Sequence, residues 1–242
     1  MTALLPTKRD EAWRYADLDA VARLWPLPAP ERILVPADES FARAIVQDTG
    51  GVQQIDLVLE AGAEAALHIL NCGGAYGRIE LSVTLHKGAD FTLGAVQIGG
   101  NTQTLEIITT VTHEEPEATS RQIVRSVLAE QATGTYLGKV AVARGAQQTD
   151  SEQSVKAMLL DRTATANAKP ELEIFADDVK CAHGCAIGEL DPMALFYLQS
   201  RGLAPAEAKT LLLQAFVAEV FEGALEQDKL QALALARLGE LV

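Results

Sequence analysis

The sequence predicts a mainly β protein with helices at both ends, on the basis of three observations. From about Ile33 to Val179 apolar residues alternate with polar or small ones, and this period of two is typical of strands with one buried face. Turn residues, chiefly glycine, separate the runs at short intervals, with no helical pattern between them. After Asp191 the apolar period becomes 3.6, as in amphipathic helices. Strands that recur this often indicate a sandwich, a barrel or a β-solenoid, and the period alone does not choose among these.

Composition narrows the class of protein. The chain has 242 residues, of which 48% are hydrophobic and 22% charged, so we expect a globular protein with one sizeable core. The formal charge of −13 argues against nucleic-acid binding, which needs basic side chains opposite the phosphates. Three cysteines form no disulfide framework, and no apolar run is long enough for a signal peptide or a membrane span. We therefore expect a cytoplasmic protein without nucleic-acid or membrane partners.

Residues 1–30 are expected to form an N-terminal helical segment and a linker. Trp13 and Val21 belong to a set of apolar residues at roughly helical spacing, and Trp13 is expected to anchor the segment on the core. Prolines at three alternate positions, 26, 28 and 30, then end any helix and favour an extended connection.

Residues 31–187 are expected to form the β core. Alternation is clear in the runs 55–59, 66–70, 79–85, 91–93, 105–107, 123–127 and 136–140. Motifs for common chemistry fail within this region. The stretch from Gly134 to Lys139 is one residue short of a phosphate-binding loop and lacks the Ser or Thr that should follow its lysine. Scattered Asp and Glu leave a carbohydrate lyase or hydrolase open, because carboxylate pairs assemble in space rather than in sequence.

Residues 188–242 are expected to form a C-terminal helical domain. Asp191 followed by proline is typical of a helix start, and Gly202 of a helix end. A second helix is expected to open at Pro205 and a third to cover 228–241.

The second of these helices carries a wide apolar stripe, which includes Leu212, Phe216 and Val220. A small helical domain has little interior of its own, so we expect part of this stripe to face a partner.

The densest group of metal-binding residue types is Cys181-Ala-His183-Gly-Cys185. In an extended chain these three side chains lie on one face, because the period of a strand is two. The two cysteines would then be about 13 Å apart, too far for a disulfide or for one shared ion. Two readings stay open: a partial site for iron or zinc that needs ligands from elsewhere, or two small buried cysteines beside a core histidine.

The run ADDVKCAHGCAIGELD, followed closely by FYLQSRGL, resembles the C-terminal signature of the SufD branch of the SufB/SufD family, part of the Suf iron–sulfur cluster assembly machinery. The similarity continues through 206–221, and a fainter one appears in Glu11-Ala-Trp13-Arg14-Tyr15. Two features depart from the family pattern. Cys185-Ala186 stands where the family usually has Ala-Thr, and the chain is short for the family, chiefly in its N-terminal part.

The resemblance implies a right-handed parallel β-helix core, with a short N-terminal helix and a C-terminal helical domain. It implies a non-catalytic scaffold subunit that pairs with a SufB-like scaffold and a SufC-like ATPase. His183, with Cys181 second, would bind a transient iron–sulfur cluster shared with the partner subunit. The turn Ser200-Arg201-Gly202 and the helix after it, with Leu212, Phe216 and Val220, would dock the ATPase.

Two alternatives to this assignment stay open. The chain could be a SufB-like principal scaffold, although Cys72 is then the only further cysteine for accepting persulfide sulfur. It could be a β-solenoid enzyme acting on carbohydrate. Self-pairing as a homodimer also stays open.

Overall fold

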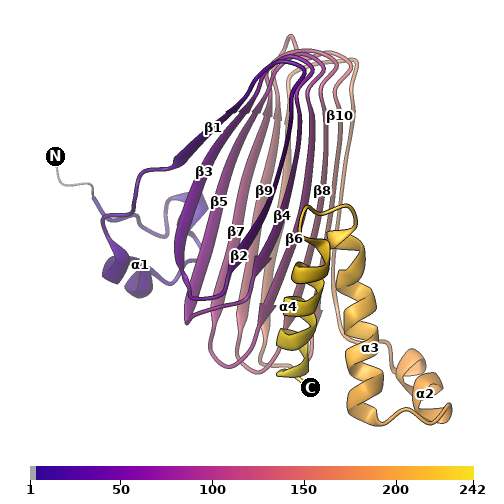
Figure 1. Cartoon of the computed structure of the whole chain (residues 1–242). Coiled ribbons are helices and arrows are strands. Elements are labelled where there is room, and N and C mark those ends of the chain that lie inside the picture. Colours follow the sequence, from indigo (N-terminus) through magenta and orange to yellow (C-terminus); the bar gives the residue numbers. More distant parts are fainter. Residues whose placement is uncertain (1–3) are drawn as a thin grey trace.

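The computed structural model describes residues 4–242, and its core is a β-solenoid of two parallel sheets (Figure 1). Odd-numbered strands form sheet A, in the order β1-β3-β5-β7-β9-β11, and even-numbered strands form sheet B, in the order β12-β10-β8-β6-β4-β2. Successive strands alternate between the sheets, so the chain coils and each coil adds one strand to each sheet. The strands are β1 Glu31–Val35, β2 Ser40–Gln47, β3 Gly51–Leu59, β4 Glu64–Asn71, β5 Tyr76–Leu85, β6 Asp90–Gly99, β7 Thr104–His113, β8 Thr119–Leu128, β9 Thr133–Val142, β10 Asp150–Leu159, β11 Thr165–Ile174 and β12 Lys180–Gly188.

The coils stack in register, and this explains why alternation was visible in the sequence. Val83 pairs with Val111, and Val111 with Val140, on three successive strands of sheet A. All three side chains are buried in the interior between the sheets, where β-branched residues suit the pleated surface. The expected β-helix core is thus confirmed, and the sandwich and barrel alternatives are wrong.

Helices α3 Pro205–Ala218 and α4 Gln227–Gly239 lie on the outer face of sheet B, with the 3-10 turn η2 Glu219–Phe221 between them (Figure 1). Helix α2 Pro192–Ser200 packs against α3, beyond the end of the strands. Leu213 and Leu238 are fully buried against residues of β4, β6 and β8. None of the helices within residues 4–242 is long and apolar enough to cross a membrane.

Gly94 and Arg125 set the close approach of η2 to sheet B. A Cβ atom at Gly94 would lie 2.2 Å from the carbonyl oxygen of Val220, so only glycine permits this contact. Arg125 donates from Nε and Nη2 to one carboxylate oxygen of Glu219, at 3.0 and 2.5 Å. The close contact at Gly94 and the ion pair between Arg125 and Glu219 therefore both hold the C-terminal helices against sheet B.

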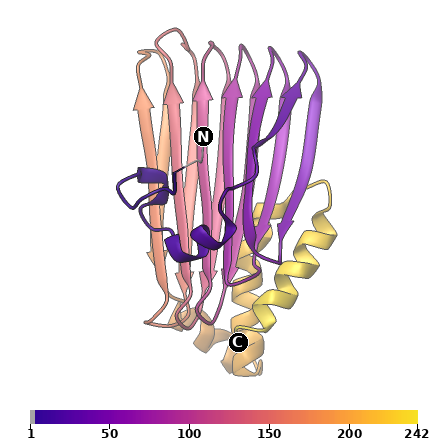
Figure 2. The same ribbon diagram turned by 90° about the vertical axis from the view of Figure 1, so that its left-hand side faces the viewer.

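The N-terminal segment crosses the outer face of sheet A, on the side of the solenoid away from the C-terminal helices (Figure 2). It contains the 3-10 turn η1 Glu11–Trp13 and helix α1 Leu18–Leu24, so the helix expected from the sequence is present but interrupted. Residues 1–3 of the predicted N-terminal part lie outside the described residues. The side chain of Asp17 caps α1 by accepting from the backbone N–H groups of Asp19 and Ala20.

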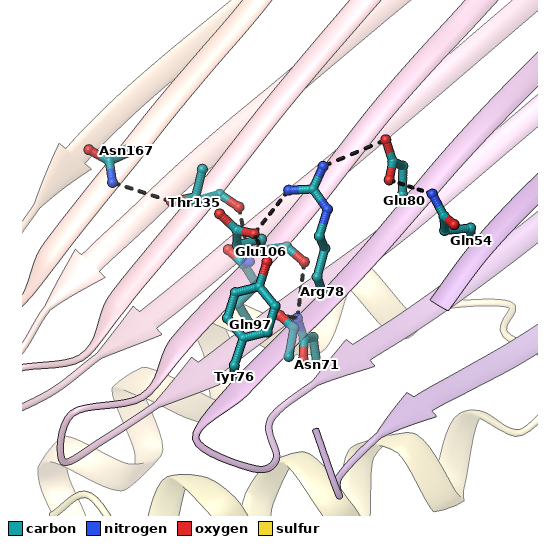
Figure 3. Close-up of polar contacts among 10 residues, drawn as sticks. Gln54, Asn71, Tyr76, Arg78, Glu80, Gln97, Glu106, Thr135 and Asn167 are labelled. Carbon is teal, nitrogen blue, oxygen red and sulfur yellow. Dashed lines mark hydrogen bonds and ion pairs between the residues drawn. The ribbon is translucent and has the colours of Figure 1, made fainter. Parts of the chain in front are cut away.

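Trp13 anchors this segment, as the sequence suggested, and its main partner is the buried Arg78 of β5. The guanidinium of Arg78 stacks 3.8 Å from the centre of the Trp13 ring. Beneath the ring, Arg78 pairs with Glu106 of β7 at 2.9 Å, and Tyr76 donates its hydroxyl to the same carboxylate at 2.6 Å (Figure 3). Lys169 of β11 pairs with Glu11 at 2.6 Å and holds the segment near the last coil.

A candidate ligand row at the end of the solenoid

Strand β12 carries Cys181, His183 and Cys185, which we call the β12 row. Register with β10 pairs them with Ser151, Gln153 and Val155 in that order. These three β10 residues are buried in the solenoid interior. Each residue of the β12 row therefore lies next to a β10 residue that faces the interior, and the β12 row belongs to the last coil of the stack.

Among residues 4–242 no further coil covers β12, which is the outermost strand of sheet B. His183 and Cys185 are exposed, and Cys181 is half-buried. The reading in which both cysteines and the histidine are buried core residues is therefore wrong. Extended backbone brings the three side chains to one face, as the sequence predicted, and the end of the stack makes that face accessible.

The backbone of β12 is also open along its free edge. Lys180 donates its N–H to the carbonyl of Thr149 at 2.8 Å, toward β10. Successive residues of a parallel strand bond to opposite neighbours, so His183 and Cys185 direct their N–H and C=O groups away from β10. An unpaired strand edge of this kind is able to accept another strand.

The β12 row does not make a complete metal site. Cys181 and Cys185 are four residues apart in an extended strand, about 13 Å, so one ion cannot contact both. Within residues 4–242 no three His, Cys, Asp or Glu side chains lie close enough to hold a metal ion together. One or two ligands from this row would need others from a second molecule.

Both thiols of the row are held in their protonated form. Desolvation raises the pKa of Cys181, and the nearby charge of Asp150 raises it further. Desolvation also raises the pKa of Cys185. Metal binding by either sulfur would therefore release a proton, and its affinity would rise with pH.

The third cysteine lies elsewhere. Cys72 follows β4, four strands from β12 in sheet B, and is buried beside Leu233 and Arg237 of α4. The structure does not bring it to the β12 row.

The predicted ATPase-docking residues fall into two groups. Ser200 ends α2, Arg201 and Gly202 form the turn after it, and all three are exposed. They adjoin an exposed apolar surface on α2, where Met193 is 70% and Phe196 65% exposed. We call Met193, Phe196, Tyr197 and the 200–202 turn the α2 surface.

The apolar stripe of α3 faces mostly inward, which corrects part of the sequence-based expectation. Val220 is 2% exposed and packs in the core between η2 and sheet B, so it offers no surface to a partner. Leu212 and Phe216 are half-buried, and Phe216 packs against the same core. The reason is Gly94, whose missing side chain lets this part of the helical domain settle directly on the sheet.

Sequence reasoning missed the polar rows that lead inward from the β12 row. Ser120-Arg-Gln122-Ile-Val124 and Ser151-Glu-Gln153-Ser-Val155 share one pattern, one coil apart, and each pairs in register with the next. The β12 row occupies the same positions in the following coil. The recurring S-x-Q-x-V pattern was the signal that could have revealed these rows.

Comparison with known proteins supports the resemblance. Residues 46–216 match the family described as "SUF system FeS cluster assembly, SufBD core domain". The chain is 32% identical over 186 residues to the iron–sulfur cluster assembly protein SufD of Escherichia coli, covering 76% of this chain and 44% of that protein. It is 37% identical over 165 residues to the chloroplastic protein ABCI7 of Arabidopsis thaliana, covering 67% of this chain and 35% of that protein.

A third relative, the SufD protein of Bacillus subtilis, is 30% identical over 160 residues, which is 65% of this chain and 36% of that protein. The chain thus spans less than half the length of these relatives. The matched region nonetheless includes most of the solenoid, the β12 row, α2 and most of α3. The chain therefore belongs to the SufBD core family of iron–sulfur cluster assembly proteins, and is SufD-like within it.

Proposed function

We propose that the chain is a non-catalytic scaffold subunit for iron–sulfur cluster assembly. It pairs with a SufB-like subunit through the open end formed by β11 and β12, and it binds a SufC-like ATPase through the α2 surface. The observation that carries the proposal is the accessible β12 row at a strand edge with unpaired backbone groups. Pairing there would place His183 and Cys181 at the interface, where a partner supplies the ligands that this row lacks.

The ligand types suit assembly rather than storage. A neutral imidazole is a borderline ligand, and a thiol that must lose a proton binds less tightly than a preformed thiolate. A nascent cluster held by one or two such groups can be released to an acceptor protein, which a closed four-thiolate site would oppose. The cluster is therefore cargo shared with the partner subunit.

Co-expression with a SufB-like subunit and a SufC-like ATPase tests the assembly. We expect the three proteins to co-purify, and the reconstituted complex to develop iron–sulfur absorbance that this chain alone does not. The chain could instead self-pair through the same edge, which analytical ultracentrifugation of the isolated chain would detect as a dimer. A stable cluster on the isolated monomer would contradict the proposed shared site.

Phe196→Asp tests the α2 surface. The aromatic side chain is 65% exposed, so its replacement should leave the fold intact while placing a charge in an apolar contact. We expect ATPase binding to weaken by about tenfold or more, measured by calorimetry, because central aromatic side chains commonly contribute over 1 kcal/mol to an interface.

Leu225→Asp is the matched control for that variant. Leu225 is also 65% exposed, but it lies in the turn before α4 rather than on α2. Its replacement should leave ATPase affinity within about twofold of the unmodified chain, as is usual for surface changes outside a contact. Equal weakening by both variants would show that the ATPase does not bind specifically at the α2 surface.

A further inference from the structure

The interior of the solenoid below His183 is polar, whereas most of the core is aliphatic. Gln122 of β8, Gln153 of β10 and His183 of β12 occupy one row on three successive strands. Gln122 and Gln153 are each only 1% exposed. Burying two amide side chains is costly unless they are hydrogen-bonded, so the row needs a structural or functional reason.

Tyr136 of β9 orders this row from across the interior. Its hydroxyl lies 3.2 Å from Oε1 of Gln122, to which it donates, and accepts from Nε2 of Gln153 at 3.3 Å. A Cβ atom at Gly138 would lie 2.2 Å from the Tyr136 hydroxyl, so glycine at that position makes room for the ring. Burial raises the pKa of Tyr136 to about 12, which keeps its hydroxyl protonated.

This arrangement leaves one acceptor of Gln153 unused. Nε2 is committed to Tyr136, and the buried Oε1 has no hydrogen-bond partner within the described part of the chain. Nε2 of Gln122, in register on β8, also lacks a partner, so Oε1 of Gln153 lies between two candidate donors, this amide and the imidazole of His183. The residue in register with Tyr136 on the next coil is Ala168 of β11. Because alanine is small, it leaves room in the interior beside Gln153. His183 stands in register above Gln153 itself. Paired residues on adjacent strands lie about 4.8 Å apart, within reach of a glutamine and an imidazole side chain.

We propose that Gln153 is a positioning residue for His183: when the imidazole turns toward the interior, one ring N–H donates to the free Oε1 of Gln153. This inference rests on the proposed role of His183 as a cluster ligand. A neutral imidazole has one N–H and one free lone pair, so fixing the N–H toward the interior directs the lone pair to the open end. Histidine ligands in metal sites are usually held in this way by a carbonyl or carboxylate oxygen.

The geometry also explains why the acceptor is an amide rather than a carboxylate. A buried carboxylate opposite a neutral tyrosine would need its own charge partner, and none of Thr109, Gln122 or Tyr136 supplies one. The amide supplies the same acceptor oxygen without a net charge, and its N–H₂ group binds Tyr136, which fixes the oxygen's direction.

The test compares Gln153→Met with Gln122→Met. Methionine retains much of the volume and removes the hydrogen-bonding atoms. Both glutamines contact the Tyr136 hydroxyl, but only Gln153 is adjacent to His183, so Gln122→Met is the matched control.

The first readout is the tautomer of His183, measured on the full chain by nitrogen-15 NMR with labelled histidine at a pH where the ring is neutral. The signal is assigned by its loss in His183→Ala. We expect one dominant tautomer in the unmodified chain and in Gln122→Met, and a mixture of tautomers in Gln153→Met. The second readout is cluster yield on the assembled complex, which should fall about tenfold or more for Gln153→Met only, the usual effect of losing such a partner.

The outcomes separate this inference from the proposed function. If Gln153→Met leaves the tautomer of His183 unchanged, or if both methionine variants alter it equally, the positioning role is wrong, whatever cluster assembly does. If the tautomer responds as expected but His183→Ala assembles clusters normally, Gln153 still orients His183 and the ligand role of His183 is wrong. A Gln153→Met chain that loses thermal stability without a tautomer change would show a purely structural role.

Discussion

His183→Ala should reduce iron–sulfur cluster yield on the assembled complex by about an order of magnitude or more, while the fold and subunit pairing survive. Loss of a residue that merely orients a metal-binding histidine commonly costs 10–100-fold in affinity, so loss of the ligand itself should cost at least as much. The side chain is exposed, and a change at an exposed site away from special features typically alters the free energy of unfolding by less than about 0.5 kcal/mol. Melting temperature and iron–sulfur absorbance are measured on the same preparations.

Two control variants sharpen this test. His86→Ala removes a partly exposed histidine from the turn after β5, far along sheet A from the last coil, and should change neither quantity. Cys185→Ala should reduce cluster yield less than His183→Ala does, because Cys185 is too far from Cys181 to share an ion with it. A lower melting temperature with unchanged cluster yield per folded complex would contradict a ligand role for His183.

Arg78→Ala should lower the free energy of unfolding by about 3–5 kcal/mol. The substitution leaves the carboxylate of Glu106 buried without its cationic partner, and it removes the guanidinium that stacks on Trp13. Both Arg78 and Glu106 are essentially without solvent exposure, so water cannot replace the lost interaction. Urea unfolding followed by circular dichroism measures the effect.

Arg32→Ala is the matched control on the same sheet. Arg32 lies 3.9 Å from Asp56 and its side chain is 86% exposed, so its loss should cost less than about 1 kcal/mol. A double variant, Arg78→Met with Glu106→Leu, removes both buried charges and should recover much of the stability. If Arg78→Ala is as mild as Arg32→Ala, the prediction that the buried pair with Glu106 stabilises the fold by several kcal/mol is wrong.

The local features of the fold were predictable from the sequence, because they arise from neighbouring residues. The period of two marked the strands, and Asp191-Pro192 marked the start of α2. The same period placed Cys181, His183 and Cys185 on one face of an extended strand. Trp13 was expected to anchor the N-terminal segment, and it does.

The features that were not predictable from the sequence depend on contacts between residues far apart in the chain. Alternation shows which side chains share a face, but not that β12 is the last strand of its sheet, so the exposure of His183 was not predictable. The stacking of Trp13 on Arg78 joins residues on different elements. Val220 was misassigned to a partner surface because the side of α3 and η2 that meets the sheet depends on Gly94, over a hundred residues earlier.

The position of the β12 row at the end of the stack affects its local stability. In a solenoid each repeat gains stability from the repeats on either side, so the total resembles a sum of nearest-neighbour terms. The coil formed by β11 and β12 has such a neighbour on one side only. Like the first coil, formed by β1 and β2, it is thus more prone to fraying in the free subunit than the inner coils are. A strand added along β12 would stiffen the ligands in the same step that completes their coordination. Assembly of the subunits and readiness to accept iron would then be one cooperative transition.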